Sequence, residues 1–349
     1  MARAILRAGA YLPAYTDGVR RLGAADEDAL TYASAALERA ARTGPELKPP
    51  VTVHPLGTVA TLDAGTFAAL LGTEVSLETV GPGTSAVELF RAAQRGSGPH
   101  WLVVSAGGGR ASERSVLSAP GEGAVALLID EAPDARGSDP EALAPASHAS
   151  ADALASWFEF AERAGNASWS GDWTADPTRG AVSSHSSAPD VAAGSLVSQG
   201  AFVPGPRYDE SRRSRWRFEA DRCGRCGQRT FPARGRCRSC GATEALQHER
   251  LPLGGWTVVA STVIGRGGQP TEFDAQVEAT GPYGVVLAEL ATDARVTLQV
   301  APELTSPPAV GSRVDTGLRR LYSIEGAWRY GRKAVPLEGS PAAPSRGRG

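Results

Sequence analysis

The hydrophobic positions of the first 50 residues change from a continuous run to a helical repeat. Residues 4–12 form an apolar run that leads into Pro13, which predicts a buried strand ending in a turn. Apolar residues then recur at helical spacing from Leu30 to Ala40, and Asp26 is the expected N-cap of this helix. A strand followed by a helix is therefore the predicted beginning of the fold.

Two later apolar runs, residues 101–106 and 123–129, are continuous and bounded by glycines, which is typical of strands buried on both faces. A capping-box pattern predicts a helix over residues 85–95. Another helix is predicted over residues 151–164, whereas residues 165–206 show little regular pattern. Strands that alternate with helices indicate a layered α/β architecture.

The pattern becomes β-rich after residue 250. Strands are predicted at five places separated by Gly and Pro, and five short strands of this kind fit a small closed barrel of OB type. The predicted strands are 256–264, 283–290, 295–300, 312–321 and 329–336. The chain is thus predicted to join an α/β part to an all-β part.

Composition and charge restrict the kinds of partner and the cellular location that we expect for this chain. The chain has 36 Lys and Arg against 38 Asp and Glu, so its net charge of −2 offers no global attraction for nucleic acid or anionic membranes. No apolar run approaches the roughly 20 residues that span a bilayer, and arginines interrupt residues 1–7 before a signal-peptide core develops. We expect no membrane association and a cytoplasmic location.

The four cysteines form the most specific motif. Cys223-Gly-Arg-Cys226 and Cys237-Arg-Ser-Cys240 are two metal-binding knuckles with ten residues between them. Four thiolates without an open position are typical of structural zinc, or less often iron, and not of a catalytic metal. Two disulfides are the alternative, but they would require an oxidising compartment. We predict one structural zinc ion.

A basic and aromatic segment precedes the knuckles. It contains Arg212, Arg213, Arg215 and Arg217, interleaved with Trp216 and Phe218. Beside a ribbon and a barrel, such a segment can bind nucleic acid or another phosphate-bearing ligand. A solvated helix face is an equally good interpretation.

Sequence signals for catalysis are weak. The five histidines have no spacing that makes a metal site or a nucleophile–base pair, and most are expected in loops or at the surface. No Gly-x-Ser-x-Gly elbow lies between a strand and a helix. Residues 107–109 are three glycines that lack the rest of a dinucleotide fingerprint, so a loop is expected there. With the cysteines assigned to metal, no thiol remains for covalent catalysis.

Residues 208–336 resemble the zinc-ribbon plus OB-fold proteins that accompany thiolases and are linked to acyl-CoA. The resemblance rests on the basic and aromatic lead-in, the two Cys-x-x-Cys-Gly knuckles with Phe231-Pro232-Ala233-Arg234 between them, Trp256-Thr257-Val258, the segment 281–290, and Val310-Gly311-Ser312-Arg313-Val314. In that family the module binds or orients acyl-CoA beside a thiolase-type partner. The resemblance implies acyl-CoA as ligand, with Arg212, Arg213 and Arg215 as candidates for its phosphates.

Residues 1–130 resemble the beginning of a hydroxymethylglutaryl-CoA synthase of the thiolase superfamily. The shared segments are 9–13, 26–31, 83–86 and 121–129. The family's nucleophilic cysteine precedes the Gly-Thr turn by three residues, and Val80 occupies that position here. Val59 stands where an acidic residue is expected near Gly57-Thr58, and His185 is a poor substitute for the family's histidine. An isopropyl group forms no thioester, so the resemblance implies a degenerate domain.

These observations predict five parts of the chain. They are a thiolase-like half-domain over 1–200, a basic lead-in helix over 207–220, a zinc ribbon over 221–245, an OB-fold domain over 246–338 and a disordered tail over 339–349.

The preferred function is a non-catalytic acyl-CoA-binding accessory subunit. It pairs through residues 1–130 with itself or with an active thiolase or synthase. An active synthase-like acyltransferase is the first alternative, and a nucleic-acid-binding ribbon–OB protein is the second.

Overall fold

The computed structural model describes the main elements of two compact units, Met1–His185 and Ser186–Gly349, which are described separately. The residues described are 3–11, 15–16, 21–22, 26–41, 47, 49–79, 86–106, 123–131, 168–170, 205–290, 294–304, 306–324 and 327–337. The predicted helix at 151–164 and the tail at 339–349 lie outside them. Among the described residues, no helix has the length and apolar character needed to cross a membrane.

The first unit is built on a mixed six-stranded sheet in the order β5-β4-β6-β7-β1-β8. The strand β4 runs parallel to β5 and β6, whereas β7 is antiparallel to both β6 and β1. The strands are β1 Arg3–Tyr11, β4 Val51–Gly57, β5 Val75–Leu77, β6 His100–Ala106, β7 Gly123–Glu131 and β8 Ser168–Ser170. A separate two-stranded sheet pairs β2 (Tyr15–Thr16) with β3 (Arg21–Leu22).

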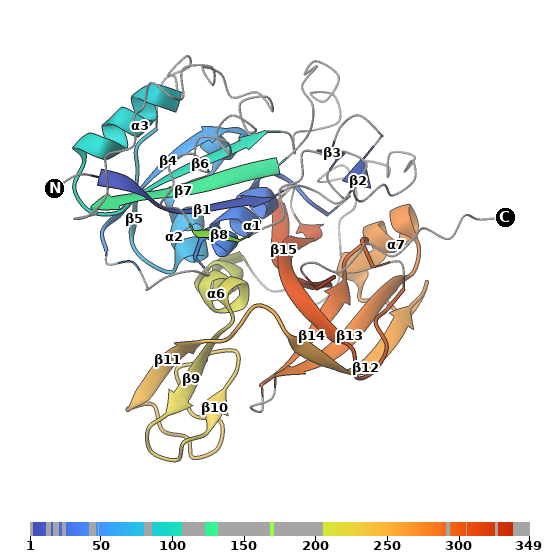
Figure 1. Ribbon diagram of the computed structural model, residues 1–349. Helices are drawn as coiled ribbons and strands as arrows, with labels where there is room; N and C mark the ends of the chain where they lie inside the picture. Colours follow the sequence, from blue (N-terminus) through green and yellow to red (C-terminus); the bar gives the residue numbers. More distant parts are fainter. Residues whose placement is uncertain are drawn as a thin grey trace. The chain divides into compact units, whose positions relative to one another are not determined.

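Helices cover both faces of this sheet, with α1 and α2 on one face and α3 on the other (Figure 1). The helices are α1 Ala29–Ala41, α2 Ala64–Leu71 and α3 Ala86–Arg95, and a 3₁₀ turn η1 covers Thr58–Thr61. The first seven residues of β7 are buried without alternation, as predicted for a strand covered on both sides. The layered α/β prediction is therefore confirmed for the described part of this unit.

The N-cap of α1 differs from the prediction. Asp28 occupies this position instead of Asp26, because its carboxylate accepts the Thr31 N–H at 3.2 Å while the Thr31 hydroxyl accepts the Asp28 N–H at 2.8 Å. Close packing of α1 on β1 requires Gly9, since a Cβ there would lie 2.2 Å from the Ala36 carbonyl oxygen. The absence of a side chain at Gly9 therefore allows α1 to pack directly on the backbone of β1.

The second unit begins with helix α6 (Gly205–Arg217), followed by a three-stranded sheet in the order β10-β9-β11. The helix ends three residues earlier than predicted, because Phe218 adopts a left-handed conformation (φ 52°) and turns its ring into the core. The sheet comprises β9 Glu219–Cys223, β10 Arg229–Thr230 and β11 Leu246–Arg250. Residues 246–250, predicted in the barrel domain, therefore belong to the ribbon sheet.

Five further strands close into a barrel in the order β12-β13-β14-β16-β15. They are β12 Trp256–Ile264, β13 Tyr283–Leu290, β14 Ala294–Val300, β15 Arg313–Ile324 and β16 Ala327–Val335, so all five predicted strands are confirmed. Between β12 and β13 lie a 3₁₀ turn η3 (Thr271–Phe273) and helix α7 (Asp274–Thr280).

The barrel core continues into the ribbon. Phe218 and Phe231 pack against the buried indole of Trp256, with ring centroids 5.3 and 6.1 Å from it. Val258 and Val286, from neighbouring barrel strands, are also fully buried in this cluster. Helix end, ribbon and barrel consequently share one apolar core.

Candidate metal centre and basic helix

All four cysteines meet at one point of the ribbon, where their sulfur atoms lie within 4.8 Å of one another. Cys223 Sγ is 3.7 Å from Cys240 Sγ, and Cys226 Sγ is 3.5 Å from Cys237 Sγ. Four sulfurs around a tetrahedral zinc ion, with Zn–S bonds of about 2.3 Å, would be about 3.8 Å apart. The spacing of these two sulfur pairs therefore suits a metal ion of this size.

The two knuckles have the same backbone geometry. In the first, the Gly227 N–H donates to the Cys223 carbonyl at 2.8 Å, and in the second the Gly241 N–H donates to the Cys237 carbonyl at 3.0 Å. Both glycines have positive φ, 72° and 74°, which an L side chain would strain. Open space surrounds Gly227, so the turn itself is what requires glycine there.

Sulfur protonation within the cluster is uneven. Backbone N–H groups of Cys240 and Ser239 donate to the Cys237 sulfur and lower its pKa to about 6. The Gln228 N–H lowers the pKa of Cys226, but hydrogen bonding with Cys237, desolvation and hydrogen bonding with the two other thiols together outweigh this effect and raise the pKa to about 12. Four adjacent sulfurs hold their full negative charge only when a cation lies among them.

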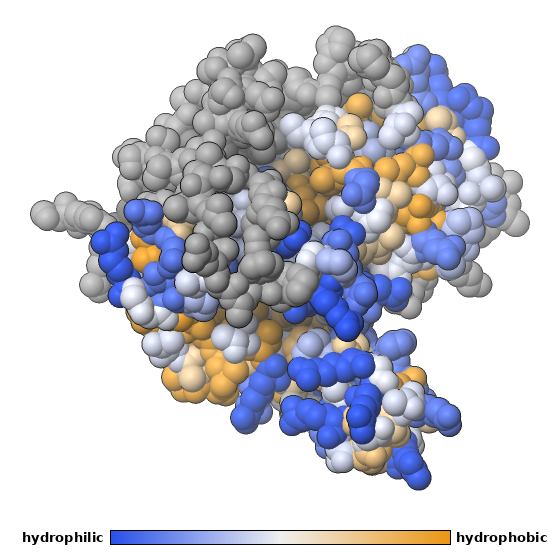
Figure 2. All heavy atoms as spheres, turned by 180° about the vertical axis from the view of Figure 1, so that it is seen from behind, coloured by the Kyte–Doolittle hydropathy of each residue, from blue (hydrophilic) through white to orange (hydrophobic). Residues whose placement is uncertain are grey.

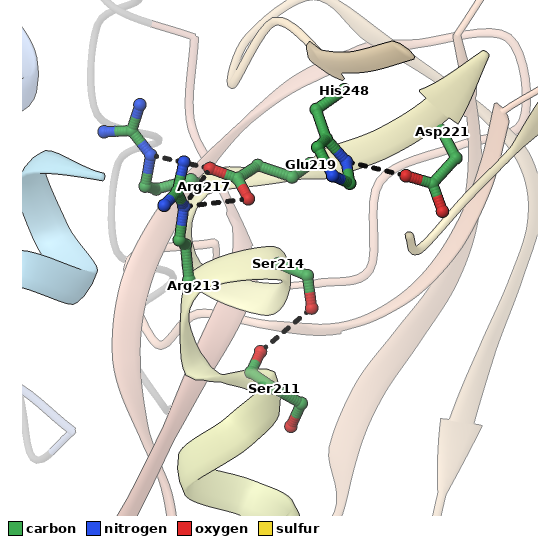
Figure 3. Close-up of polar contacts among 7 residues, drawn as sticks. All are labelled: Ser211, Arg213, Ser214, Arg217, Glu219, Asp221 and His248. Carbon is green, nitrogen blue, oxygen red and sulfur yellow. Dashed lines mark hydrogen bonds and ion pairs between the residues drawn. The ribbon is translucent and has the colours of Figure 1, made fainter. Parts of the chain in front are cut away.

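Asp221, which the sequence interpretation missed, organises the loop between the knuckles. Its fully buried carboxylate accepts the N–H groups of Arg234 and Gly235, both at 2.9 Å. Its other oxygen lies 2.7 Å from Nδ1 of the exposed His248 (Figure 3). An acidic residue two positions before the first cysteine was the available sequence signal, but the loop that it binds lies at least 13 residues away.

The arginines of α6 are largely engaged within the second unit. Arg213 Nε donates to both oxygens of Glu219, at 2.9 and 3.1 Å, and Arg217 Nε donates to the same carboxylate at 3.2 Å (Figure 3). Arg212 forms an ion pair with Asp209. Arg215 is exposed and has no hydrogen bond or ion pair with the described residues. It is thus the predicted phosphate-binding residue that is most available.

Helix α6 is held on β16 through the backbone of Tyr330. The Tyr208 hydroxyl accepts the Tyr330 N–H at 2.8 Å and donates to its carbonyl at 3.3 Å, and Trp216 Nε1 donates to the same carbonyl at 3.3 Å. Arg329 lies over the Tyr208 ring, 4.7 Å from its centroid. Burial raises the pKa of Tyr208, so its hydroxyl stays protonated and able to donate.

Removing the Tyr208 hydroxyl tests this contact. We expect Tyr208→Phe to lower the free energy of unfolding by about 1–3 kcal/mol, because the partly buried Tyr330 N–H loses its acceptor. Urea unfolding followed by circular dichroism measures the change. Arg207→Ala on the same helix, whose side chain is 77% exposed, is the control and should change stability by less than about 0.5 kcal/mol. Equal stabilities of Tyr208→Phe and the unaltered chain would contradict the role of this contact.

Two histidines that are 46 residues apart in sequence form a buried pair in the first unit. His54 of β4 and His100 of β6 are 0% and 2% exposed, and His54 Nε2 lies 2.8 Å from His100 Nδ1. Glu78 Oε2 lies 3.4 Å from His54 Nδ1. Burial lowers the pKa of His54 to about 4, although Glu78 opposes the shift. The expectation of loop or surface positions is therefore wrong for these two histidines.

The positions suggested by the synthase resemblance are only partly described. Val59 is fully buried, and its N–H donates to the Ser105 hydroxyl at 3.0 Å, which in turn lies 2.7 Å from the Thr58 hydroxyl. These contacts join the ends of β4 and β6. Val80 and His185 lie outside the described residues, as do the glycines at 107–109.

Comparisons with known proteins yield partial structural likenesses. No family model and no curated protein matches the chain. PksG, an HMG-CoA synthase from Bacillus subtilis, is 14% identical over 41% of this chain and 44% of its own, with a TM-score of 0.33. The Ltp2–ChsH2(DUF35) aldolase is 19% identical over 36% of this chain and 90% of its own, with a TM-score of 0.26.

A third structure, an HMG-CoA synthase complexed with CoA, is 14% identical over 38% of this chain and 43% of its own, with a TM-score of 0.30. The chain thus spans less than half the length of the two synthases that it matches.

Proposed function

We propose that this chain is a non-catalytic accessory subunit that binds acyl-CoA and contains one structural zinc ion. It pairs through residues 1–130 with itself or with an active thiolase or hydroxymethylglutaryl-CoA synthase. The observation that carries the proposal is the cysteine cluster, because the chain has four cysteines and all four contribute to it. No thiol is left to form the acyl thioester that thiolase-type chemistry requires.

The barrel supports the ligand-binding part of the proposal. Its five strands follow the order β12-β13-β14-β16-β15, and β14 and β16 pair in parallel. This arrangement matches a five-stranded Greek-key barrel, so we assign it to the OB class. Barrels of this class bind elongated polar ligands, and a CoA with its nucleotide and pantetheine arm has that form.

Arg215 provides a specific test of the CoA site. We expect Arg215→Ala to weaken acetyl-CoA binding about tenfold, the effect of losing one charge-assisted hydrogen bond to a phosphate. Arg212 and Arg213 should contribute less, because their guanidinium groups already pair with Asp209 and Glu219. Isothermal titration of the full chain measures these affinities, with Arg207→Ala as the control that leaves binding unchanged. Equal affinities of Arg215→Ala and Arg207→Ala for acetyl-CoA would show that Arg215 does not contribute to the binding site.

Two further measurements separate the proposal from its alternatives. Incubation with acyl-labelled CoA should leave no acyl group on the chain, and retained label would instead favour the acyltransferase. Titration with single-stranded oligonucleotides should show weaker binding than titration with acetyl-CoA. Tight oligonucleotide binding with a steep salt dependence, and no CoA binding, would favour the nucleic-acid alternative.

A further inference from the structure

The strand β12 leaves the barrel halfway along its length. Its first half is held on both sides, since Trp256 pairs with Val314, and Val258 exchanges backbone hydrogen bonds with Ser312 and Gly311 at 2.9 and 2.8 Å. A register shift follows directly after Val258. From this bulge onward the described residues give β12 a neighbouring strand on one side only.

The second half of β12 presents an open edge. It pairs with β13 from Ala260–Leu287 to Ile264–Tyr283, and its other side has no backbone hydrogen bond to any described residue. Every side chain from Val259 to Val263 is exposed, whereas a strand covered on one face would alternate between buried and exposed positions. Both the backbone edge and the side chains are therefore accessible to a partner.

The composition of this edge favours pairing. Residues 259–264 contain no charge, no proline and no glycine, so beyond the bulge at Val259 the edge has none of the charged residues or prolines that usually protect an edge strand. Val263 is 57% exposed and Val259 37%, and the 65% exposed Val310 precedes the residue that bonds to Val258. Figure 2 shows apolar surface gathered over the barrel, at the lower left of the view. An edge without charge or proline can be completed by adding a strand.

We infer that the added strand is β12 of a second copy of this chain, antiparallel to the first and centred on Ser261. In this register Val263 faces Val259 of the second copy, Ala260 faces Thr262, and Ser261 lies on the twofold axis. The same surface is used by both copies, and no like charges meet because the segment is neutral. A charged partner strand would find no complementary charge on this edge.

Cysteine cross-linking of the full, metal-loaded chain tests this register. On the twofold axis two Ser261→Cys residues would have Cα atoms about 4.5–5.5 Å apart, which is within the range of a disulfide. We expect mild oxidation to give at least about tenfold more covalent dimer from Ser261→Cys than from Thr297→Cys, an exposed position on β14 away from the edge. The amount of covalent dimer formed by the unaltered chain measures any linkage through the native cysteines.

A lysine introduced on the edge tests whether the cross-linking depends on pairing of the two β12 strands. Adding Val263→Lys to Ser261→Cys should abolish the excess of covalent dimer, because two lysines would then border the axis and remain solvated. Equal cross-linking with and without this lysine, or equal cross-linking of Ser261→Cys and Thr297→Cys, overturns the inference. A chain that sediments as a dimer but fails these tests associates through another surface, which leaves the proposed accessory function intact.

Discussion

The Cys237→Ser chain is expected to carry almost no metal and to lose the structure of its ribbon. Cys237 is 2% exposed and contributes one of four sulfurs, so its loss removes a ligand and leaves three thiols without a complete site. Binding of structural zinc supplies about 10–16 kcal/mol in small zinc domains, and this free energy is folding energy. Metal analysis should fall from about one zinc per chain to near zero. Hydrogen exchange should accelerate across residues 219–250.

Ser239→Ala is the matched control, because Ser239 is exposed in the same knuckle and contributes no sulfur. This variant should keep its metal and its exchange protection. Since Phe231 packs on Trp256, loss of the ribbon should also reduce the stability of the barrel. Stoichiometric metal in Cys237→Ser would refute the four-sulfur site, and iron in the unaltered chain would refute zinc.

Acidification should destabilise the chain through His54. Its pKa is about 4 in the folded state and 6.5 in the reference state, so the unfolded chain binds more protons between these values. The contribution of His54 is therefore complete above pH 6.5 and is lost as the pH falls toward 4. The difference in pKa corresponds to about 3 kcal/mol of unfolding free energy.

His54→Gln isolates this effect, because glutamine does not titrate. The variant should be less stable at neutral pH but should lose less stability than the unaltered chain between pH 6.5 and 4. If His54→Gln fails to fold, NMR titration of the unaltered chain measures the pKa directly. A midpoint near 6.5 would contradict the structural interpretation.

The metal centre could be predicted from the sequence because its determinants are local. Each Cys-x-x-Cys-Gly turn is closed by hydrogen bonds spanning four or five residues, as between Gly227 and Cys223. The barrel strands were equally readable, since β-branched residues lie between Gly and Pro. In the knuckles and the barrel strands, the residues that determine the structure are close together in the sequence, so the structure could be predicted.

The histidine pair could not be predicted, because it depends on the pairing of two distant strands. His54 and His100 meet through the parallel register in which Thr52 lies opposite His100. The strand β4 itself was missed, since Pro55 interrupts its apolar run. That proline is tolerated because β5 pairs with β4 only at residues 51–53, so none of the described strands lies beside Pro55 on that side.

The basic segment shows a different limit of sequence interpretation. Its arginines indicate a phosphate site or a solvated helix, and neither reading anticipates that Arg213 and Arg217 share Glu219. That contact depends on the reversal at Phe218, where a bulky residue adopts a left-handed conformation. The energy of core packing decides this conformation, and residue spacing alone does not reveal it.

The attachment of α6 to Tyr330 determines where the chain can be shortened. The helix supplies side-chain partners for backbone groups of β16 on the side away from β15. A fragment that starts at Glu219 would retain the cysteines and all five barrel strands but would expose this second strand edge, and it would then tend to aggregate. Fragments intended for separate study of the ribbon and barrel should therefore begin before Gly205.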